Sequence, residues 1–143
     1  MKILGLDPGS RRVGVAVSDD LGMTASGLTT LTWTNFEKLL NGIQDLCRQY
    51  KVEKIVVGLP MRMDGTLGPE AKKVLTLVEA LKEKLKLEIV TWDERFSTMA
   101  VERVLIEADL SRKKRKKVRD KVAATYILQG YLDSLSAAGG GAP

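Results

Sequence analysis

The feature that most constrains the fold is a short apolar run without alternation, Lys54-Ile-Val-Val-Gly58, in the middle of the chain. A strand with one wetted face alternates apolar and polar residues, whereas a continuous run is typical of a strand covered on both faces in a parallel sheet. Parallel neighbours need a long crossover, which is usually a helix. The run therefore predicts an α/β domain.

The patterns on either side of this run fit the same class. Apolar and β-branched runs predict strands at residues 2–6, 13–17, 28–33, 54–58 and 87–92. Helical spacing predicts helices that begin near Thr34, which has capping-box spacing to Glu37, at Pro69, and near Ser97 or Thr98. A last helix is expected to follow a basic run and extend to about Leu135. This order predicts an N-terminal antiparallel meander whose first strand joins parallel strands through right-handed crossovers.

The composition excludes several kinds of catalytic site. The 143 residues include no histidine and one cysteine, so Ser-His-Asp and Cys-His machinery and zinc sites built on histidine are ruled out. Cys47 falls on the apolar stripe of a predicted helix, which indicates a core thiol. We predict a cytoplasmic protein, because the chain has a single cysteine and its first residues do not form an apolar leader. We expect no membrane segment, because no apolar stretch approaches ~20 residues. We expect one domain over residues 1–135 and a flexible, glycine-rich tail over 136–143.

Acidic residues follow or flank the predicted elements at three places. Asp7 ends the first strand, Asp93 and Glu94 end the strand at 87–92, and Asp120 shares a helical stripe with Ala124 and Ile127. Simpler roles exist for each: a turn-initiating aspartate, a helix N-terminal acid and an ion pair. Sites of open α/β sheets form at the carboxyl ends of the strands, however.

Carboxylates that converge at such an edge predict a site for Mg²⁺ or Mn²⁺, because hard divalent cations prefer oxygen ligands. Two such ions can activate water and stabilise the leaving oxygen in phosphodiester cleavage, which needs no histidine. If the strand at 87–92 lies two places from the first, their ends are about 9 to 10 Å apart. We therefore prefer the longer Glu94 as ligand, with Asp93 as the alternative.

Four motifs together resemble a known family. They are DPGSRRVGVAVSD at 7–19, VVGLP with MDGT at 56–66, WDERFST at 92–98, and KVRDKVAATYILQGYL at 117–132. Over about residues 2–135 the chain is similar to the YqgF/RuvX family of RNase H-like proteins, whose members are described as Holliday junction resolvases or as nucleases that mature the 5′ end of pre-16S rRNA.

The resemblance implies an RNase H-like mixed five-stranded sheet in the order 3-2-1-4-5 with flanking helices. It also implies that Asp7, Glu94 and Asp120 are the metal-binding and catalytic acids. The same resemblance implies that Arg12, Arg95 and Thr98 either bind the substrate or support the residues that hold the metal. The strand at 54–58 ends in Gly-Leu-Pro and lacks the glutamate that resolvases carry there.

A run of cations precedes Asp120 in the sequence. The whole chain carries 23 Lys and Arg against 18 Asp and Glu, a net charge of +5. Eight of those cations and one acid lie in residues 112–121, so this segment holds +7 and the remainder −2. We predict that it binds nucleic acid phosphates, the alternative being a solvated loop without a partner. The uninterrupted part of the run is Arg112, Lys113, Lys114, Arg115, Lys116 and Lys117.

The sequence thus predicts a metal-dependent endonuclease that acts on nucleic acid, with rRNA precursor favoured and ribosome biogenesis as its setting. One alternative is a Holliday junction resolvase, which needs a two-fold dimer; we expect a monomer or weak homodimer. Another is a non-catalytic RNA-binding module of ribosome assembly, which the missing acid after Val57 favours. A nucleotide-binding domain of the sugar-kinase type would need a second domain, for which 143 residues leave no room. Trp33, Trp92 and Phe96 are candidates for base stacking, although aromatic residues at strand ends more often belong to the core.

Overall fold

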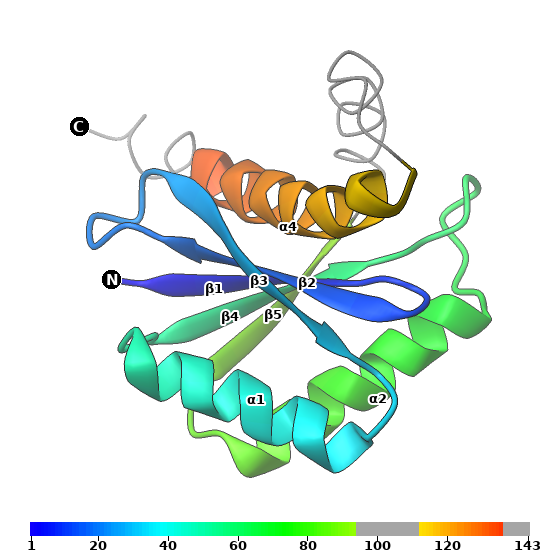
Figure 1. The fold of residues 1–143 in the computed structure, drawn as a ribbon, viewed down its shortest axis with the longest axis horizontal. Coiled ribbons are helices and arrows are strands. Elements are labelled where there is room, and N and C mark those ends of the chain that lie inside the picture. Colours follow the sequence, from blue (N-terminus) through cyan, green and yellow to red (C-terminus); the bar gives the residue numbers. More distant parts are fainter. Residues whose placement is uncertain (94–111, 136–143) are drawn as a thin grey trace.

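A single mixed sheet organises the computed structural model, which describes residues 1–93 and 112–135, with side chains from residue 121 onward in the second range. The five strands lie in the order β3-β2-β1-β4-β5 (Figure 1). The strands pair antiparallel from β1 to β3 and parallel from β1 through β4 to β5. The predicted fold class and strand order are confirmed. The strands are β1 (Ile3–Pro8), β2 (Arg12–Ser18), β3 (Ala25–Thr32), β4 (Lys54–Leu59) and β5 (Glu88–Asp93).

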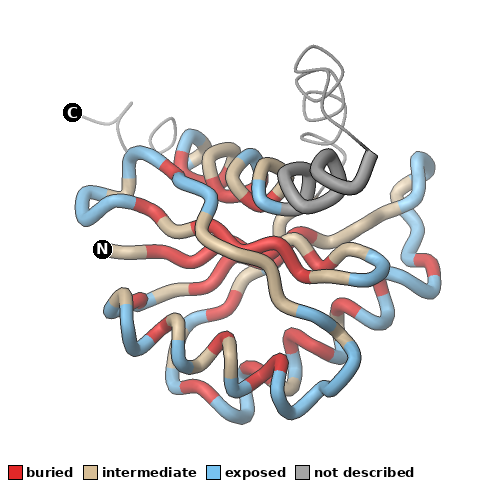
Figure 2. The backbone as a smooth tube through the Cα atoms, viewed as in Figure 1, coloured by how far each residue is buried: buried red, intermediate tan, exposed pale blue. Residues whose placement is uncertain are grey.

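Helices cover both faces of the sheet, as the apolar run of β4 predicts. Helices α1 (Phe36–Gln49) and α2 (Pro69–Lys84) lie on one face, which we call the α1/α2 face. Helix α4 (Arg112–Leu135) crosses the other, the α4 face (Figure 1). Each interface has its own apolar core, and Figure 2 shows the buried residues concentrated along the central strands. Within β4, Ile55 and Val57 join the α1/α2 core and Val56 joins the α4 core.

Two helix starts differ from the prediction. The N-cap of α1 is Asn35, whose side-chain oxygen accepts a 3.0 Å hydrogen bond from the backbone N–H of Lys38. The hydroxyl of Thr34 lies 2.9 Å from that of Thr32 instead, so Thr34 does not cap the helix. The last helix begins at Arg112, within the basic run and not after it. The loop alternative for that run is therefore wrong, because its backbone forms the first turns of α4.

The segment between β4 and α2 forms a small hairpin. Met61 and Leu67 make an isolated antiparallel bridge, and Gly65 adopts a φ of 85°, which glycine tolerates. The Asp64 carboxylate accepts hydrogen bonds from the backbone N–H of Thr66 at 3.0 Å and from its hydroxyl at 2.7 Å. Pro69 is the first residue of α2, as predicted. No helix in the described ranges is long and apolar enough to cross a membrane.

Candidate active site

Asp7 lies near the carboxyl end of the central strand, on the α4 face. Successive residues of a strand point to opposite faces. Leu4 and Leu6 of β1 belong to the α1/α2 core and Ile3 to the α4 core, so Asp7 shares the face of Ile3. Asp7 is half-buried and pairs across β2 with Gly14, which contributes no side chain beside the carboxylate.

The turn after Asp7 is held by hydrogen bonds from two directions. The backbone N–H of Gly9 donates to the carbonyl oxygen of Asp7 at 2.9 Å. The indole N–H of Trp33, which follows β3, donates to the carbonyl oxygen of Gly9 at 2.7 Å. The ammonium of Lys73 lies 4.1 Å from the centroid of the Trp33 ring. The β1–β2 turn is thereby connected to both the β3–α1 connection and helix α2.

Helix α4 runs antiparallel to β1, so its N-terminal half lies toward the carboxyl end of that strand (Figure 1). Near the start of β1, the side chain of Gln129 bonds to the backbone of Met23 and Ala25. Farther along, Ala124 and Leu128 lie directly over Gly5, where an added Cβ would be 2.7 Å from the Cβ of Leu128.

Position 120 precedes Ala124 by about one turn of helix, a rise of roughly 6 Å. Asp7 follows Gly5 by two residues of strand, roughly 7 Å, toward the same end of the sheet. The backbone at Asp120 therefore runs near the carboxyl end of β1, as the metal-site prediction requires. The side chain of Asp120 is outside the described residues.

Strand β5 places Asp93, one of the two acids that the sequence left as alternatives. Trp92 lies on the α4 face, where its ring meets Tyr131 edge-on at 5.8 Å. Asp93 pairs with Leu59 of β4, and Leu59 packs against the α1/α2 core. Asp93 thus lies on the opposite face from Asp7, which argues against it as a shared ligand. Glu94, Arg95 and Thr98 lie outside the described residues, so their predicted roles are untested.

Arg12 begins β2 on the same face as Asp7. It is two residues from Gly14, the direct partner of Asp7, which makes Arg12 and Asp7 diagonal neighbours across the strand pair. Such pairs are about 7 to 8 Å apart at Cα, within reach of an arginine side chain. Arg12 is half-buried. Its position suits the predicted role in holding a phosphate beside the acids.

The described residues fit a divalent cation in part. Asp7 offers the hard oxygen donor that Mg²⁺ or Mn²⁺ prefers, at the strand end where α4 brings the backbone of Asp120. Within residues 1–93 and 121–135, no group of three acidic, cysteine or histidine side chains is close enough to hold a metal. The side chains of Glu94 and Asp120, the other predicted ligands, fall outside those ranges.

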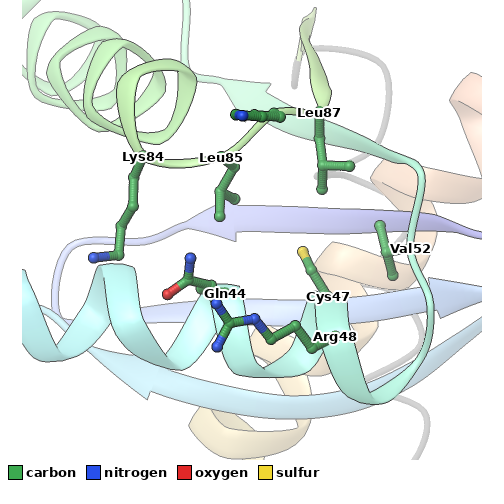
Figure 3. A pocket seen from close by; sticks show the side chains of 8 residues that line it. Gln44, Cys47, Arg48, Val52, Lys84, Leu85 and Leu87 are labelled. Carbon is green, nitrogen blue, oxygen red and sulfur yellow. The ribbon is translucent and has the colours of Figure 1, made fainter.

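A cavity of about 330 Å³ lies away from these acids, between the C-terminal ends of α1 and α2 (Figure 3). Its lining combines apolar side chains and Cys47 with three cations and contains no acid. Cations are favoured at helix C-termini by the helix dipole, which accounts for Arg48 and Lys84. The cavity therefore has neither the ligands nor the location for metal-assisted hydrolysis. Its lining residues are Gln44, Cys47, Arg48, Val52, Lys84, Leu85, Lys86 and Leu87.

The contact of Trp33 with the turn after Asp7 could not be read from the sequence pattern. Trp33 and Gly9 are 24 residues apart, and their hydrogen bond depends on how β3 returns to the end of β1. The position of Trp33 at a strand end was the only signal, and it did not distinguish core packing from base stacking.

Comparison with known proteins agrees with this arrangement. The family model described as "RuvX: Holliday junction resolvase" matches residues 1–134. A Clostridium botulinum (strain Hall) protein named "Putative pre-16S rRNA nuclease" is 57% identical over 136 residues, covering 95% of this chain and 99% of its own. Its Clostridium tetani counterpart of the same name is 55% identical over 135 residues, with 94% and 98% covered.

Among solved structures, the chain resembles Thermus thermophilus RuvC in complex with a Holliday junction substrate. The TM-score is 0.62, the identity 14%, and 96% of each chain is covered, a likeness that shows the fold. The strand order and the match over nearly the whole length agree with one another. The chain belongs to the RuvX family.

Proposed function

We propose that this protein is a divalent-metal-dependent endonuclease that hydrolyses phosphodiester bonds in the precursor of 16S rRNA. The observation that carries the proposal is the half-buried Asp7, placed at the carboxyl end of the central strand on the face crossed by α4. The relatives named above as pre-16S rRNA nucleases favour RNA as substrate. Such a precursor is processed in the cytoplasm, where we place the protein, and we assign the activity to residues 1–135.

Each residue of the proposed site has a distinct task. Asp7, Glu94 and Asp120 hold Mg²⁺ or Mn²⁺ through carboxylate oxygens. When bound, the ion supplies a lowered pKa for the attacking water and neutralises charge that develops on the phosphate. Arg12 holds a phosphate oxygen beside Asp7, and Arg95 and Thr98 bind the neighbouring backbone.

The basic run at 112–117 supports the same proposal. It occupies the start of α4, eight to three residues before Asp120, so phosphates attracted to it lie next to the proposed metal site. Contacts to phosphates position a nucleic acid without reading its sequence. The run therefore accounts for binding of the backbone, while the selection of the cleavage site is left to the shape of the RNA.

The decisive experiment compares Asp7→Asn with the parent on labelled rRNA precursor in the presence of Mn²⁺. Asparagine keeps the shape and removes the charge, so cleavage should fall by roughly 10²- to 10⁴-fold while RNA binding is little changed. Asp45→Asn is the matched control, because Asp45 is an exposed acid on α1, on the other side of the sheet. An Asp7→Asn protein that cleaves as fast as the parent contradicts the proposal.

A resolvase is the second candidate, favoured by the description of the matching family model. The same assay should include a four-way DNA junction and unstructured single-stranded RNA. Cleavage of the junction alone, with two symmetric nicks, identifies a resolvase. No cleavage of any substrate, together with no Mn²⁺ binding at millimolar metal by calorimetry, leaves an RNA-binding module.

A further inference from the structure

Trp33 is joined to the turn that follows the proposed ligand Asp7. Its indole N–H donates a 2.7 Å hydrogen bond to the carbonyl oxygen of Gly9. The N–H of the same Gly9 donates to the carbonyl oxygen of Asp7 at 2.9 Å. A single side chain from the β3–α1 connection therefore fixes the backbone two residues beyond the carboxylate.

Trp33 is itself held on more than one side. Its ring packs against the α1/α2 core, and the ammonium of Lys73 lies 4.1 Å from the ring centroid, within the range of a cation–π contact. The donor of the indole is used by Gly9, and Lys73 occupies one face of the ring. This arrangement does not suit base stacking, which needs an open aromatic face.

We propose that Trp33 is a positioning residue for the metal site: through Gly9 it holds the turn in which the Asp7 carboxylate is ready to bind the ion. Ordering a loose turn at the moment of binding would cost backbone entropy and weaken affinity, whereas a turn already fixed does not incur that loss. The inference rests on the proposed function for the identity of the bound ion. The support of the turn by Trp33 does not depend on it.

The test replaces Trp33 by phenylalanine, which keeps an aromatic ring for the core and for Lys73 and removes the N–H donor. Hydrogen exchange at the Gly9 amide should become faster by about five-fold or more. The dissociation constant for Mn²⁺, measured by calorimetry, should rise by about three- to ten-fold. The metal concentration for half-maximal cleavage should rise with it, while kcat at saturating metal should stay near the parental value, because the proposal gives Trp33 no contact with the substrate.

Ile43→Val is the control matched for stability. Ile43 is fully buried in the α1/α2 core on α1, and removing one methyl group costs about as much stability as one hydrogen bond. Its Mn²⁺ affinity and Gly9 exchange should remain parental. If Trp33→Phe behaves like Ile43→Val, losing stability alone, Trp33 is only a core residue and the proposal is overturned.

Two further outcomes keep the inference separate from the proposed function. If the parent binds no Mn²⁺, the metal site fails, and Gly9 exchange decides the role of Trp33: faster exchange in Trp33→Phe supports it and unchanged exchange overturns it. If Trp33→Phe does not fold, 3-benzothienylalanine at position 33 tests the same hydrogen bond, because it keeps the two-ring shape of the side chain and has sulfur in place of the indole N–H. Faster exchange at Gly9 is again expected, and parental exchange again overturns the proposal.

Discussion

Substituting Gly5 by alanine tests how closely α4 is packed on the central strand. The added Cβ would lie 2.7 Å from the Cβ of Leu128 and 3.3 Å from the carbonyl oxygen of Ala124, while ordinary contacts are 3.4–4 Å. The helix must therefore move away by about 0.7 to 1 Å, a gap that forfeits a quarter to a half of each dispersion contact it opens. The contacts at risk belong to the buried residues Ala124, Ile127, Leu128 and Leu132.

This strain should lower the free energy of unfolding by about 2–3 kcal/mol, the upper part of the range for overpacked cores. For a domain of this size, the midpoint of thermal unfolding should fall by roughly 8–12 °C. Urea unfolding measures the change directly, and an unaltered m-value would show that the unfolded state is the same. Because α4 carries Asp120, Mn²⁺ affinity should fall as well.

Gly27→Ala is the control for this substitution. Its Cβ would meet the Cβ of Lys121 and the hydroxyl of Thr125, both at 3.3 Å, so these neighbours need to give by only a few tenths of an ångström. We expect a loss of under about 1 kcal/mol. Adding Leu128→Ala should not rescue Gly5→Ala, since the clashing atom is a Cβ that alanine retains. A Gly5→Ala protein within about 0.5 kcal/mol of the parent would refute the close packing of α4 on β1.

Three other predictions concern the thiol and the basic run. Burial raises the pKa of Cys47 from 9.0 to about 11, so folded protein should react with Ellman's reagent at pH 8 about 100-fold more slowly than unfolded protein. Because the pKa of Cys47 is raised in the folded state, the stability that this thiol contributes is complete below pH 9 and is lost as the pH rises through about 11. The Cys47→Val protein should not show this loss when its free energy of unfolding is measured by urea titration at increasing pH. An equal loss in both proteins would show that another group is responsible. Replacing residues 112–117 by glutamine should reduce the slope of log K for RNA binding against log salt concentration by about 0.7 for each phosphate contact that is lost. An unchanged slope would show that the run does not bind the RNA.

The parts of the fold that follow from local pattern were predictable from the sequence. The continuous apolar run of β4 predicted a sheet covered on both faces, and the two layers of helices confirm it. The sequence pattern placed the start of α4 too late, because the six adjacent cations include no apolar residue that would mark a helical face. Lysine and arginine are good helix formers, however, and the apolar stripe beyond Asp120 anchors the helix on the sheet.

The start of α1 was missed for a different reason. Thr34 and Asn35 are both good N-cap residues, and the spacing to Glu37 favoured Thr34. The choice depends on which side chain is engaged elsewhere. The hydroxyl of Thr34 lies beside that of Thr32, which leaves Asn35 to accept from the helix. A tertiary preference of this kind is not visible in the spacing of residues.

The choice between Asp93 and Glu94 shows what the structure adds to a site predicted from sequence. From the sequence, Glu94 was preferred because a longer side chain crosses more of the gap to β1. The described strand supplies a different reason, which is that successive side chains of a strand point to opposite faces of the sheet. Val90 and Trp92 lie on the α4 face, whereas Ile89 and the partner of Asp93, Leu59, belong to the α1/α2 core. A carboxylate at 93 is therefore on the wrong side of the sheet for Asp7, whatever its length, and Glu94, which lies outside the described residues, stays the acid that we propose.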